Sequence, residues 1–215
     1  WQDTDSSDKK YNDSFEAVLD SRRNIIGLEN GVYDLDTLTF RNGQSEDYVC
    51  KSTGNDWKPD YSWDNPVIQD IMQFVNQVLP EYETREYVLL LFASFCDGCP
   101  EEKFHIFIGS GGNGKSKLLE LLLKSLGDYC GTLPVTALTG QRTQSSNATP
   151  EIERLKGKRF VQVNEPGQKE CLQAGRLKEM TGGDSLYARA LNKDPIEFKP
   201  QFNMVMPSNV LPPVP

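Results

Sequence analysis

The order of apolar and polar positions predicts two folding styles along the chain. Between residues 24 and 40, short apolar runs alternate with polar turn residues, a pattern typical of short strands. Val67 to Leu79 carries its apolar residues at helical spacing, which predicts an amphipathic helix. Thr84 to Cys96 predicts a second helix, and because this segment is apolar almost all round we expect it to be buried. Residues 1–100 are therefore predicted to form a small α+β domain ending in helices.

From Lys103 onwards, strands and helices are predicted to alternate. Phe104 to Ile108 predicts a short buried strand, a glycine-rich loop follows, and Lys115 to Leu126 predicts a helix that Gly127 ends. Because this alternation favours a parallel sheet, residues 101–215 are expected to form an α/β domain with a central parallel sheet. The other elements expected there are helices over Thr149–Leu155 and Glu170–Met180, and strands over Arg159–Val163, Leu186–Leu191, Pro195–Phe198 and Phe202–Met206.

The strongest chemical signal is the segment Gly109 to Ser116, which fits the P-loop pattern GxxxxGK[ST] at every fixed position. Its glycines let backbone N–H groups approach phosphates, and the N-terminus of the following helix favours an anion. Lys115 is expected to contact the β- and γ-phosphates of ATP, and Ser116 to bind Mg²⁺. The residues expected to bind the nucleotide are Gly109, Ser110, Gly111, Gly112, Asn113, Gly114, Lys115, Ser116 and Lys117.

Two later strands end in polar residues that suit a P-loop ATPase. Glu165 follows the apolar run Phe160 to Val163, and a carboxylate there can act as general base and help to hold Mg²⁺. The acid that often precedes this glutamate is replaced by Asn164. Asn209 follows the last apolar strand, where it is expected to position the attacking water or sense the γ-phosphate.

The net charge of −8 does not exclude nucleic acid, because the acidity lies in the first half of the chain. Residues 1–100 hold 8 basic and 19 acidic residues, residues 101–150 hold 5 and 4, and residues 151–215 hold 10 and 8. A basic footprint over a whole domain, typical of DNA-binding proteins, is absent. Contact with a nucleic acid is therefore expected to use a few local cations, for example in a pore.

Cysteine spacing and hydropathy favour a reducing intracellular compartment. The five cysteines are odd in number and widely spaced, unlike a disulfide framework. Cys96 and Cys99 have CxxC spacing, and two reduced thiols at a helix end are favoured over a metal or redox pair because no second pair lies at zinc-ribbon distance. The longest apolar run, Val88 to Ala93, is far shorter than the roughly 20 residues of a membrane span. No secretory leader opens the chain, so secretion and membrane partners are not expected.

Four motifs in this order resemble the superfamily 3 helicases, most closely the primase-helicase type of large DNA viruses (the poxvirus-like group) and related phage proteins. The resemblance spans about residues 24–213. The four motifs are the stretches Gly109–Ser116, Val161–Pro166, Lys178–Asp184 with Tyr187–Arg189, and Met206–Asn209 with Leu211–Pro212. The stretches Ile26–Asp34 and Phe40–Arg41 resemble the small domain that precedes this helicase.

The resemblance implies an AAA+-like ATPase that assembles as a homo-oligomeric ring, usually a hexamer, and translocates on single-stranded DNA at a replication fork. In such relatives the hairpin before the last motif lines the pore. Here that hairpin is Leu186 to Phe198, so Lys193 at its tip is implied to contact DNA phosphates, with Arg189 as a second candidate. A primase domain or other replication proteins are the implied partners.

The chain departs from the family pattern in two respects. Asn164 in place of the first acid leaves Ser116 as the main protein ligand to the metal, beside Glu165. The arginine finger of relatives lies beyond the position of Pro215, so the chain is interpreted as a fragment or as lacking that region. Arg142, Arg154 and Arg159 stay open as trans-acting or structural groups.

Two other function classes also accommodate the P-loop. A small-molecule kinase requires an arginine-rich lid, yet the loop from Gln141 to Pro150 holds only Arg142. A nucleotide-gated assembly domain without unwinding activity needs neither a base nor a sensor, so Glu165 and Asn209 favour the helicase.

Four ring side chains outside the motifs are predicted to have packing roles. His105 is expected in the core, because it lies on the strand before the P-loop. Trp57, Tyr61 and Trp63 have aromatic rings that can stack on bases, but packing of their loop against the small domain is favoured.

Overall fold

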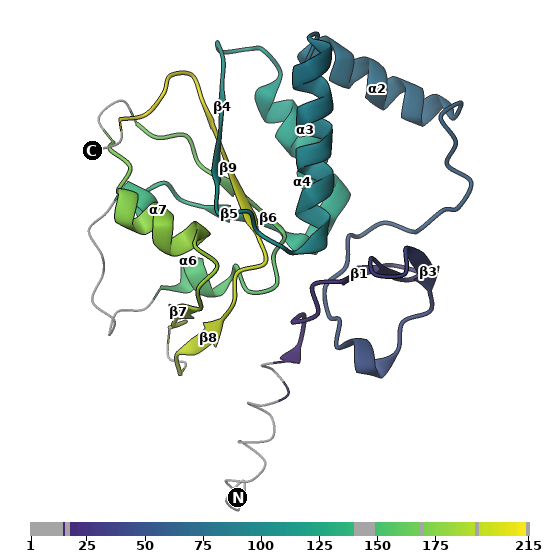
Figure 1. The fold of residues 1–215 in the computed structure, drawn as a ribbon, viewed down its shortest axis with the longest axis horizontal. Helices are drawn as coiled ribbons and strands as arrows, with labels where there is room; N and C mark the ends of the chain where they lie inside the picture. The colour runs from purple at the N-terminus through teal and green to yellow at the C-terminus, as the bar shows by residue number, and fades with distance from the viewer. Residues whose placement is uncertain (1–14, 16–17, 140–148, 168–169, 192–193, 214–215) are drawn as a thin grey trace, which may run out of the picture.

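A four-stranded parallel sheet forms the centre of the fold (Figure 1). The computed structural model describes residue 15 and residues 18–139, 149–167, 170–191 and 194–213. The strands lie in the order β4-β9-β6-β5, and all three neighbouring pairs are parallel. Their bounds are β4 Phe104–Ile108, β5 Cys130–Leu133, β6 Phe160–Val163 and β9 Asn203–Ser208.

Alternating residues of the central strand β9 enter different hydrophobic clusters on the two faces of the sheet. Met204 and Met206 belong to one cluster, and Val205 between them belongs to the other. Successive strand side chains point to opposite faces, so both faces must be covered by other elements. This requirement explains why all six residues of β9 are buried.

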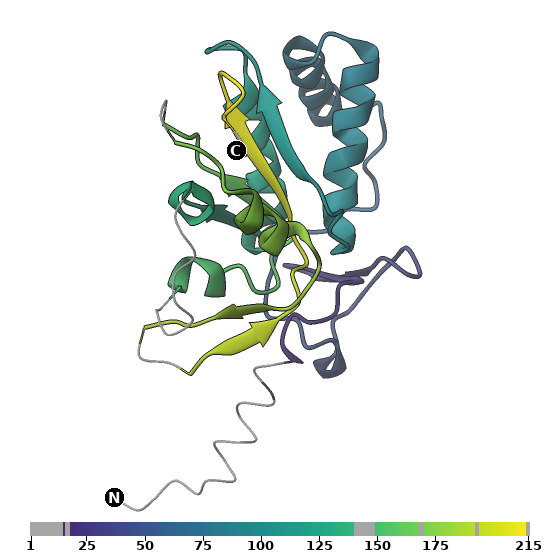
Figure 2. The same ribbon diagram turned by 60° about the vertical axis from the view of Figure 1, so that its left-hand side comes forward.

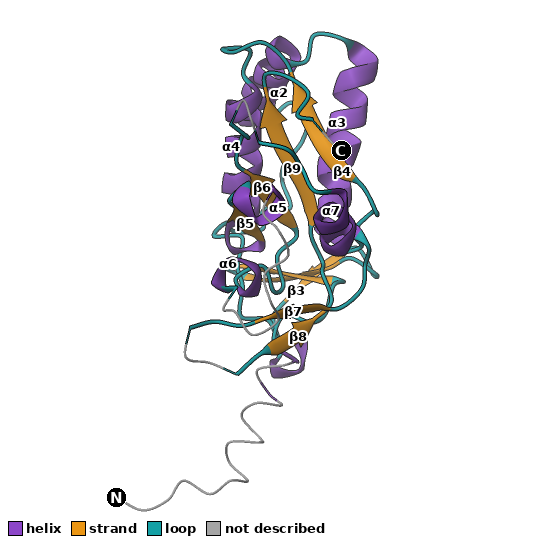
Figure 3. Cartoon of the chain, turned by 90° about the vertical axis from the view of Figure 1, so that its left-hand side faces the viewer, coloured by secondary structure: helices purple, strands orange, loops and turns teal. Residues whose placement is uncertain are grey.

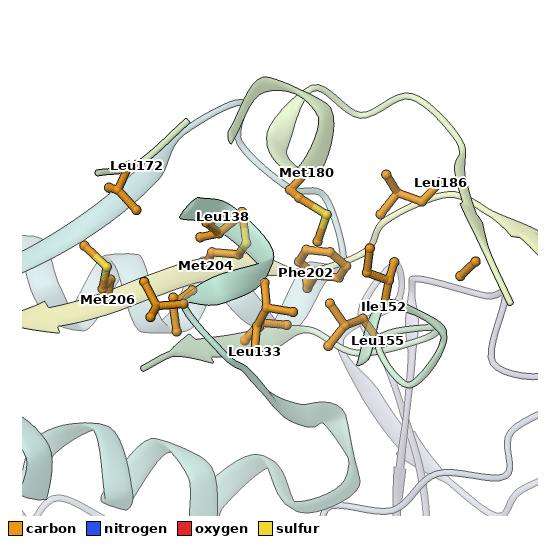
Figure 4. Packing of buried hydrophobic residues seen from close by; sticks show 14 of the residues in the cluster. Leu133, Leu138, Ile152, Leu155, Leu172, Met180, Leu186, Phe202, Met204 and Met206 are labelled. Carbon is orange, nitrogen blue, oxygen red and sulfur yellow. The ribbon is translucent and has the colours of Figure 1, made fainter. Parts of the chain in front are cut away.

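The first cluster is covered by short helices and a hairpin (Figure 4). Phe202 and Leu155 lie near its centre, and Met180 enters it from a helix above them. The covering elements are α5 Thr136–Thr139, α6 Pro150–Glu153, α7 Ala174–Thr181, and the antiparallel strands β7 Leu186–Ala188 and β8 Ile196–Phe198.

The opposite face is covered by α4 (Lys115–Leu126) and α3 (Tyr82–Ser94), as Figure 2 shows. The buried leucines of α4 lie on one stripe of the helix, at the spacing expected of an amphipathic helix. The preceding helix α2 (Pro66–Val78) packs against α4. Its first turn is capped, because the Asn65 side chain accepts a hydrogen bond from the Val67 N–H at 2.9 Å.

A small antiparallel sheet precedes the helices and docks on the parallel core. It consists of β1 Ile25–Leu28, β2 Gly31–Asp34 and β3 Thr39–Arg41. The Tyr129 hydroxyl accepts a hydrogen bond from the Gly27 N–H at 2.7 Å, and burial raises the pKa of this phenol to about 12. Short 3-10 turns lie at Ser45–Asp47, Phe95–Asp97 and Gly127–Tyr129.

Arg159 joins the small sheet to the core and is 1% exposed. Its guanidinium donates to the Arg22 carbonyl at 3.2 Å and to the Gln201 side chain at 2.6 Å, and it lies over the Tyr129 ring at 5.8 Å.

We expect Arg159→Met to lower the free energy of unfolding by about 3 kcal/mol, because buried acceptors lose their donor. Urea denaturation measures this loss. Arg154→Met is the control, since this exposed arginine should change stability by less than about 0.5 kcal/mol.

Most predicted elements are present with similar bounds, but five elements differ from the prediction. The helix over Thr84–Cys96 was expected to be buried all round, and this prediction is wrong, because Tyr87 and Leu90 on α3 are 58% and 69% exposed. The pattern did not predict β5 or α5. The helix predicted from Glu170 begins only at Ala174, and the strand predicted to Leu191 ends at Ala188. Within the described ranges, no helix is both long and apolar enough to cross a membrane.

Candidate functional site

Three neighbouring strands of the parallel sheet end at the same edge, where the predicted site residues gather. β4 leads into the glycine loop Gly109–Gly114, β9 leads into Asn209, and β6 leads into Glu165. The Gly109 N–H donates to the Ser208 carbonyl at 3.3 Å, which ties the loop to the end of β9. Ligands of open α/β sheets bind outside the carboxyl ends of the strands, so this edge is the expected place for a site.

The loop requires glycine for two separate reasons. Gly112 and Gly114 have φ values of 77° and 87°, in the left-handed region that disfavours residues with a side chain. A Cβ on Gly114 would also lie 2.6 Å from a methyl carbon of Val78 on α2, a contact too close to exist. Among the described residues, no atom beyond the adjoining backbone lies within 4 Å of a Cβ built on Gly111 or Gly112, so this part of the loop borders open space.

The Lys115 ammonium lies against the loop that precedes it. It donates to the carbonyl oxygens of Gly109 and Ser110, the latter at 3.2 Å, and to the Asn113 side chain at 3.0 Å. These partners are neutral oxygens, and a phosphate oxygen offers the same ammonium a charge-assisted hydrogen bond. The geometry therefore holds the cation against the glycine loop.

Glu165 and Asn209 meet although they lie 44 residues apart in the sequence. The Glu165 carboxylate accepts a hydrogen bond from the backbone N–H of Asn209 at 3.0 Å. Both residues are exposed, so the carboxylate keeps access to solvent. Asn164, which follows β6, continues the hydrogen bonding to β5, because its N–H donates to the Leu133 carbonyl at 3.1 Å.

The donors at this edge fit a triphosphate and a magnesium ion. The N-terminus of α4, at Lys115 and Ser116, presents backbone N–H groups that have no partner inside the helix, and it carries the positive end of the helix dipole. Mg²⁺ takes oxygen ligands and is bound through one or two protein oxygens beside substrate phosphates. The exposed Ser116 hydroxyl and the Glu165 carboxylate are oxygens of this kind.

The hairpin predicted to contact DNA lies at the opposite end of the molecule from the glycine loop (Figures 2 and 3). Arg189 follows β7 and is exposed, and its backbone pairs with Thr149: the Thr149 N–H donates to the Arg189 carbonyl at 2.8 Å. Lys193 lies outside the described residues.

The sequence leaves the roles of three arginines undecided, Arg142, Arg154 and Arg159, and the structure describes two of them. Arg159 is buried and holds the small sheet, so it has a structural role. Arg154 is exposed at the end of α6, and Arg142 lies outside the described residues.

The cysteine pair lies at the end of α3, as predicted, and both thiols are free. Burial raises the pKa of the Cys96 thiol. Among the described residues no group of three His, Cys, Asp or Glu side chains is placed to hold a metal ion.

The remaining ring side chains divide between core and surface. Burial of His105 is confirmed, and desolvation lowers the pKa of its imidazole. Trp57 packs on the small sheet, as expected, with its ring 4.8 Å from that of Tyr33. Trp63 and Tyr61 are 71% and 55% exposed, so packing against the small domain does not apply to them.

Comparison with known families matches both parts of the chain. Residues 107–215, just over half of the chain, match the model described as "Family of unknown function (DUF5906)". The chain belongs to the DUF5906 family. Residues 8–80 match the model described as "D5 N terminal like". The family match covers the glycine loop, Glu165 and Asn209 together.

Relatives of this DUF5906 chain occur in large DNA viruses. "Putative helicase L207/L206" of Acanthamoeba polyphaga mimivirus is 39% identical over 96% of the chain, and "Putative primase C962R" of African swine fever virus is 28% identical over 91% of it. These matches and the D5-like model confirm the resemblance to the helicase and primase proteins of large DNA viruses. The chain spans about a fifth of these relatives, 22% and 21% of their lengths.

Solved structures support the fold alone. The apo structure of the NrS-1 C terminal region is 15% identical, covers 86% of this chain and 54% of that chain, and has a TM-score of 0.50. Another NrS-1 C terminal structure, in its A form, covers 68% of this chain and 34% of that chain, with a TM-score of 0.51.

Sequence analysis missed the contribution of the helices before the loop. Val78 restricts Gly114, and the pair Tyr82 and Arg85 lies just beyond it at the start of α3. The sequence signal for the contact between Tyr82 and Arg85 is their i,i+3 spacing at the start of a helix, which brings an aromatic ring and an arginine to the same helix face.

Proposed function

We propose that the chain is the ATP-hydrolysing part of a DNA helicase that acts in viral genome replication, with an AAA+-like core. One observation carries the proposal: Glu165 and Asn209, from two neighbouring strands, are joined by a 3.0 Å hydrogen bond at the sheet edge that also holds the glycine loop. A carboxylate beside a phosphate-binding loop suits the activation of a water molecule for attack on a γ-phosphate.

In this proposal each site residue has one role. Lys115 binds the β- and γ-phosphates, Ser116 and Glu165 hold Mg²⁺, and Glu165 accepts the proton of the attacking water. The Asn209 side chain orients that water. Mg²⁺ would neutralise the charge that develops on the phosphates. The printed names of the relatives, which include helicase and primase, support the same assignment.

The proposed assembly is a ring, with six subunits as the expected number, around single-stranded DNA. Lys193 on the hairpin between β7 and β8 contacts the DNA phosphates, and Arg189 contributes a second cation. One cation repeated around a ring suffices for a strand in a pore, so a net charge of −8 is compatible with this function. A primase domain or other replication proteins are the proposed partners.

We expect single-stranded DNA to stimulate ATP hydrolysis, and Lys193→Ala to remove the stimulation while basal hydrolysis persists. The measurement is the steady-state ATPase rate of the full-length polypeptide across a DNA titration. Lys199→Ala is the matched control, because Lys199 is an exposed lysine just after β8. Hydrolysis that is indifferent to DNA would instead favour a nucleotide-gated assembly domain.

A further inference from the structure

The corner between α2 and α3 lies against the glycine loop. Val78, the last residue of α2, packs so closely on Gly114 that the loop has no room for a side chain there. Val78 and Leu79 also pack beside Leu118 of α4 in a small hydrophobic cluster. Figure 1 shows this corner at the same end of the molecule as the end of β4. The corner between α2 and α3 thus borders the proposed phosphate site.

The corner is held in a defined shape by Arg85. The Arg85 guanidinium donates to the carbonyl oxygens of Leu79 and Pro80, at 3.0 and 3.3 Å. A cation at the carboxyl end of a helix is favoured by the helix dipole, so these contacts also stabilise the end of α2. At the start of α3, the Thr84 hydroxyl donates to the Glu81 carboxylate at 2.6 Å.

Arg85 also orients an aromatic ring that is open to solvent. Its guanidinium carbon lies 5.5 Å from the centroid of the Tyr82 ring, within the range of a cation–π contact. Tyr82 is nevertheless 65% exposed. Tyr82 is four residues along the chain from Val78, so their Cα atoms lie at most about 14 Å apart. An exposed aromatic ring with a cation–π contact can stack on a flat ligand.

We propose that Tyr82 stacks on the base of the nucleotide whose phosphates bind the loop. The inference rests on the proposed nucleotide site and names the residue that receives the base. Stacking of a base on an aromatic side chain contributes about 1–3 kcal/mol and tolerates different bases, because every base has a π-face. The corner therefore adds affinity for nucleoside triphosphates without strict selection of the base.

The test compares a ligand that has a base with one that lacks it. Binding of a non-hydrolysable ATP analogue and of inorganic tripolyphosphate, each with Mg²⁺, is measured by calorimetry on the full chain. Tyr82→Ala is expected to weaken binding of the ATP analogue roughly 10-fold and to leave the affinity for tripolyphosphate unchanged. Tyr82→Phe, which keeps the ring, is expected to bind both ligands as the unaltered protein does. Tyr87→Ala is the control, because Tyr87 is exposed on the same helix but farther from the corner.

Each other outcome contradicts a specific part of the inference. If Tyr82→Ala binds both ligands normally while Lys115→Ala weakens both, the loop binds phosphates and Tyr82 does not contact the base. If Tyr82→Ala weakens both ligands equally, the corner only supports the loop, and stacking is wrong. If the unaltered protein binds neither ligand, the proposed nucleotide site itself is wrong.

Discussion

Replacing Lys115 with alanine is expected to lower ATP turnover by at least ~100-fold, a loss typical of removing one preorganised donor from a transition state. The ammonium lies at the start of α4 with three oxygens of the loop around it, two of them at 3.0 and 3.2 Å. No neighbouring donor on that loop carries a positive charge that can replace it. Nucleotide affinity is expected to fall with turnover, because the same cation binds the ground-state phosphates.

The control for this variant removes an equal charge from the same helix. Lys124 lies in the last turn of α4, is paired with Glu120 at 3.2 Å and has a 75% exposed side chain. Lys124→Ala is expected to hydrolyse ATP normally. Turnover that is unchanged in Lys115→Ala would remove the basis for a phosphate site at this loop.

We expect Glu165→Gln to keep nucleotide binding and to lose hydrolysis by roughly 100-fold or more, as when a general base is removed. The substitution is nearly isosteric, and the glutamine amide oxygen can still accept the hydrogen bond from the Asn209 N–H. What glutamine lacks is a carboxylate that can take a proton from water. Binding of a fluorescent ATP analogue and single-turnover hydrolysis separate the two effects.

A neighbouring carboxylate serves as control for the loss of charge. Glu170 lies after the same strand and accepts a hydrogen bond from the Gly167 N–H at 2.6 Å, so Glu170→Gln changes the same functional group outside the site. Its hydrolysis is expected to be normal. If Glu165→Gln instead fails to bind nucleotide, the role of Glu165 is structural.

Asn209 enters the site in two ways that can be separated. The observed bond to Glu165 uses the Asn209 backbone N–H, which any residue except proline supplies. The proposed contact with the attacking water uses the side-chain amide. The position of Glu165 is therefore independent of the side chain at residue 209, whereas the proposed sensing role depends on it.

Local pattern was sufficient where an element is defined by its own residues. The helix from Lys115 to Leu126 was predicted with the bounds it has, because an apolar stripe precedes a terminating Gly127. It was insufficient for β5, where Cys-Gly-Thr-Leu offers little apolar pattern. This strand exists because β6 provides a hydrogen-bonding edge, with Cys130 paired to Phe160. Likewise, the apolar run of α3 suggested burial, yet packing on one side alone left Tyr87 and Leu90 at the surface.

The sequence by itself determined the residues of the proposed site: a glycine loop with Lys115, a strand ending in Glu165 and a strand ending in Asn209. These are short motifs whose residue types suit the proposed phosphate and water chemistry, so they can be recognised without a fold. Only the tertiary structure decided their proximity and their surroundings. The tertiary fold brings Glu165 against Asn209 across 44 residues, buries Arg159 as a structural group and sets Val78 against Gly114 of the loop. Such contacts depend on which distant segments share one packed core, and local residue patterns do not specify that pairing.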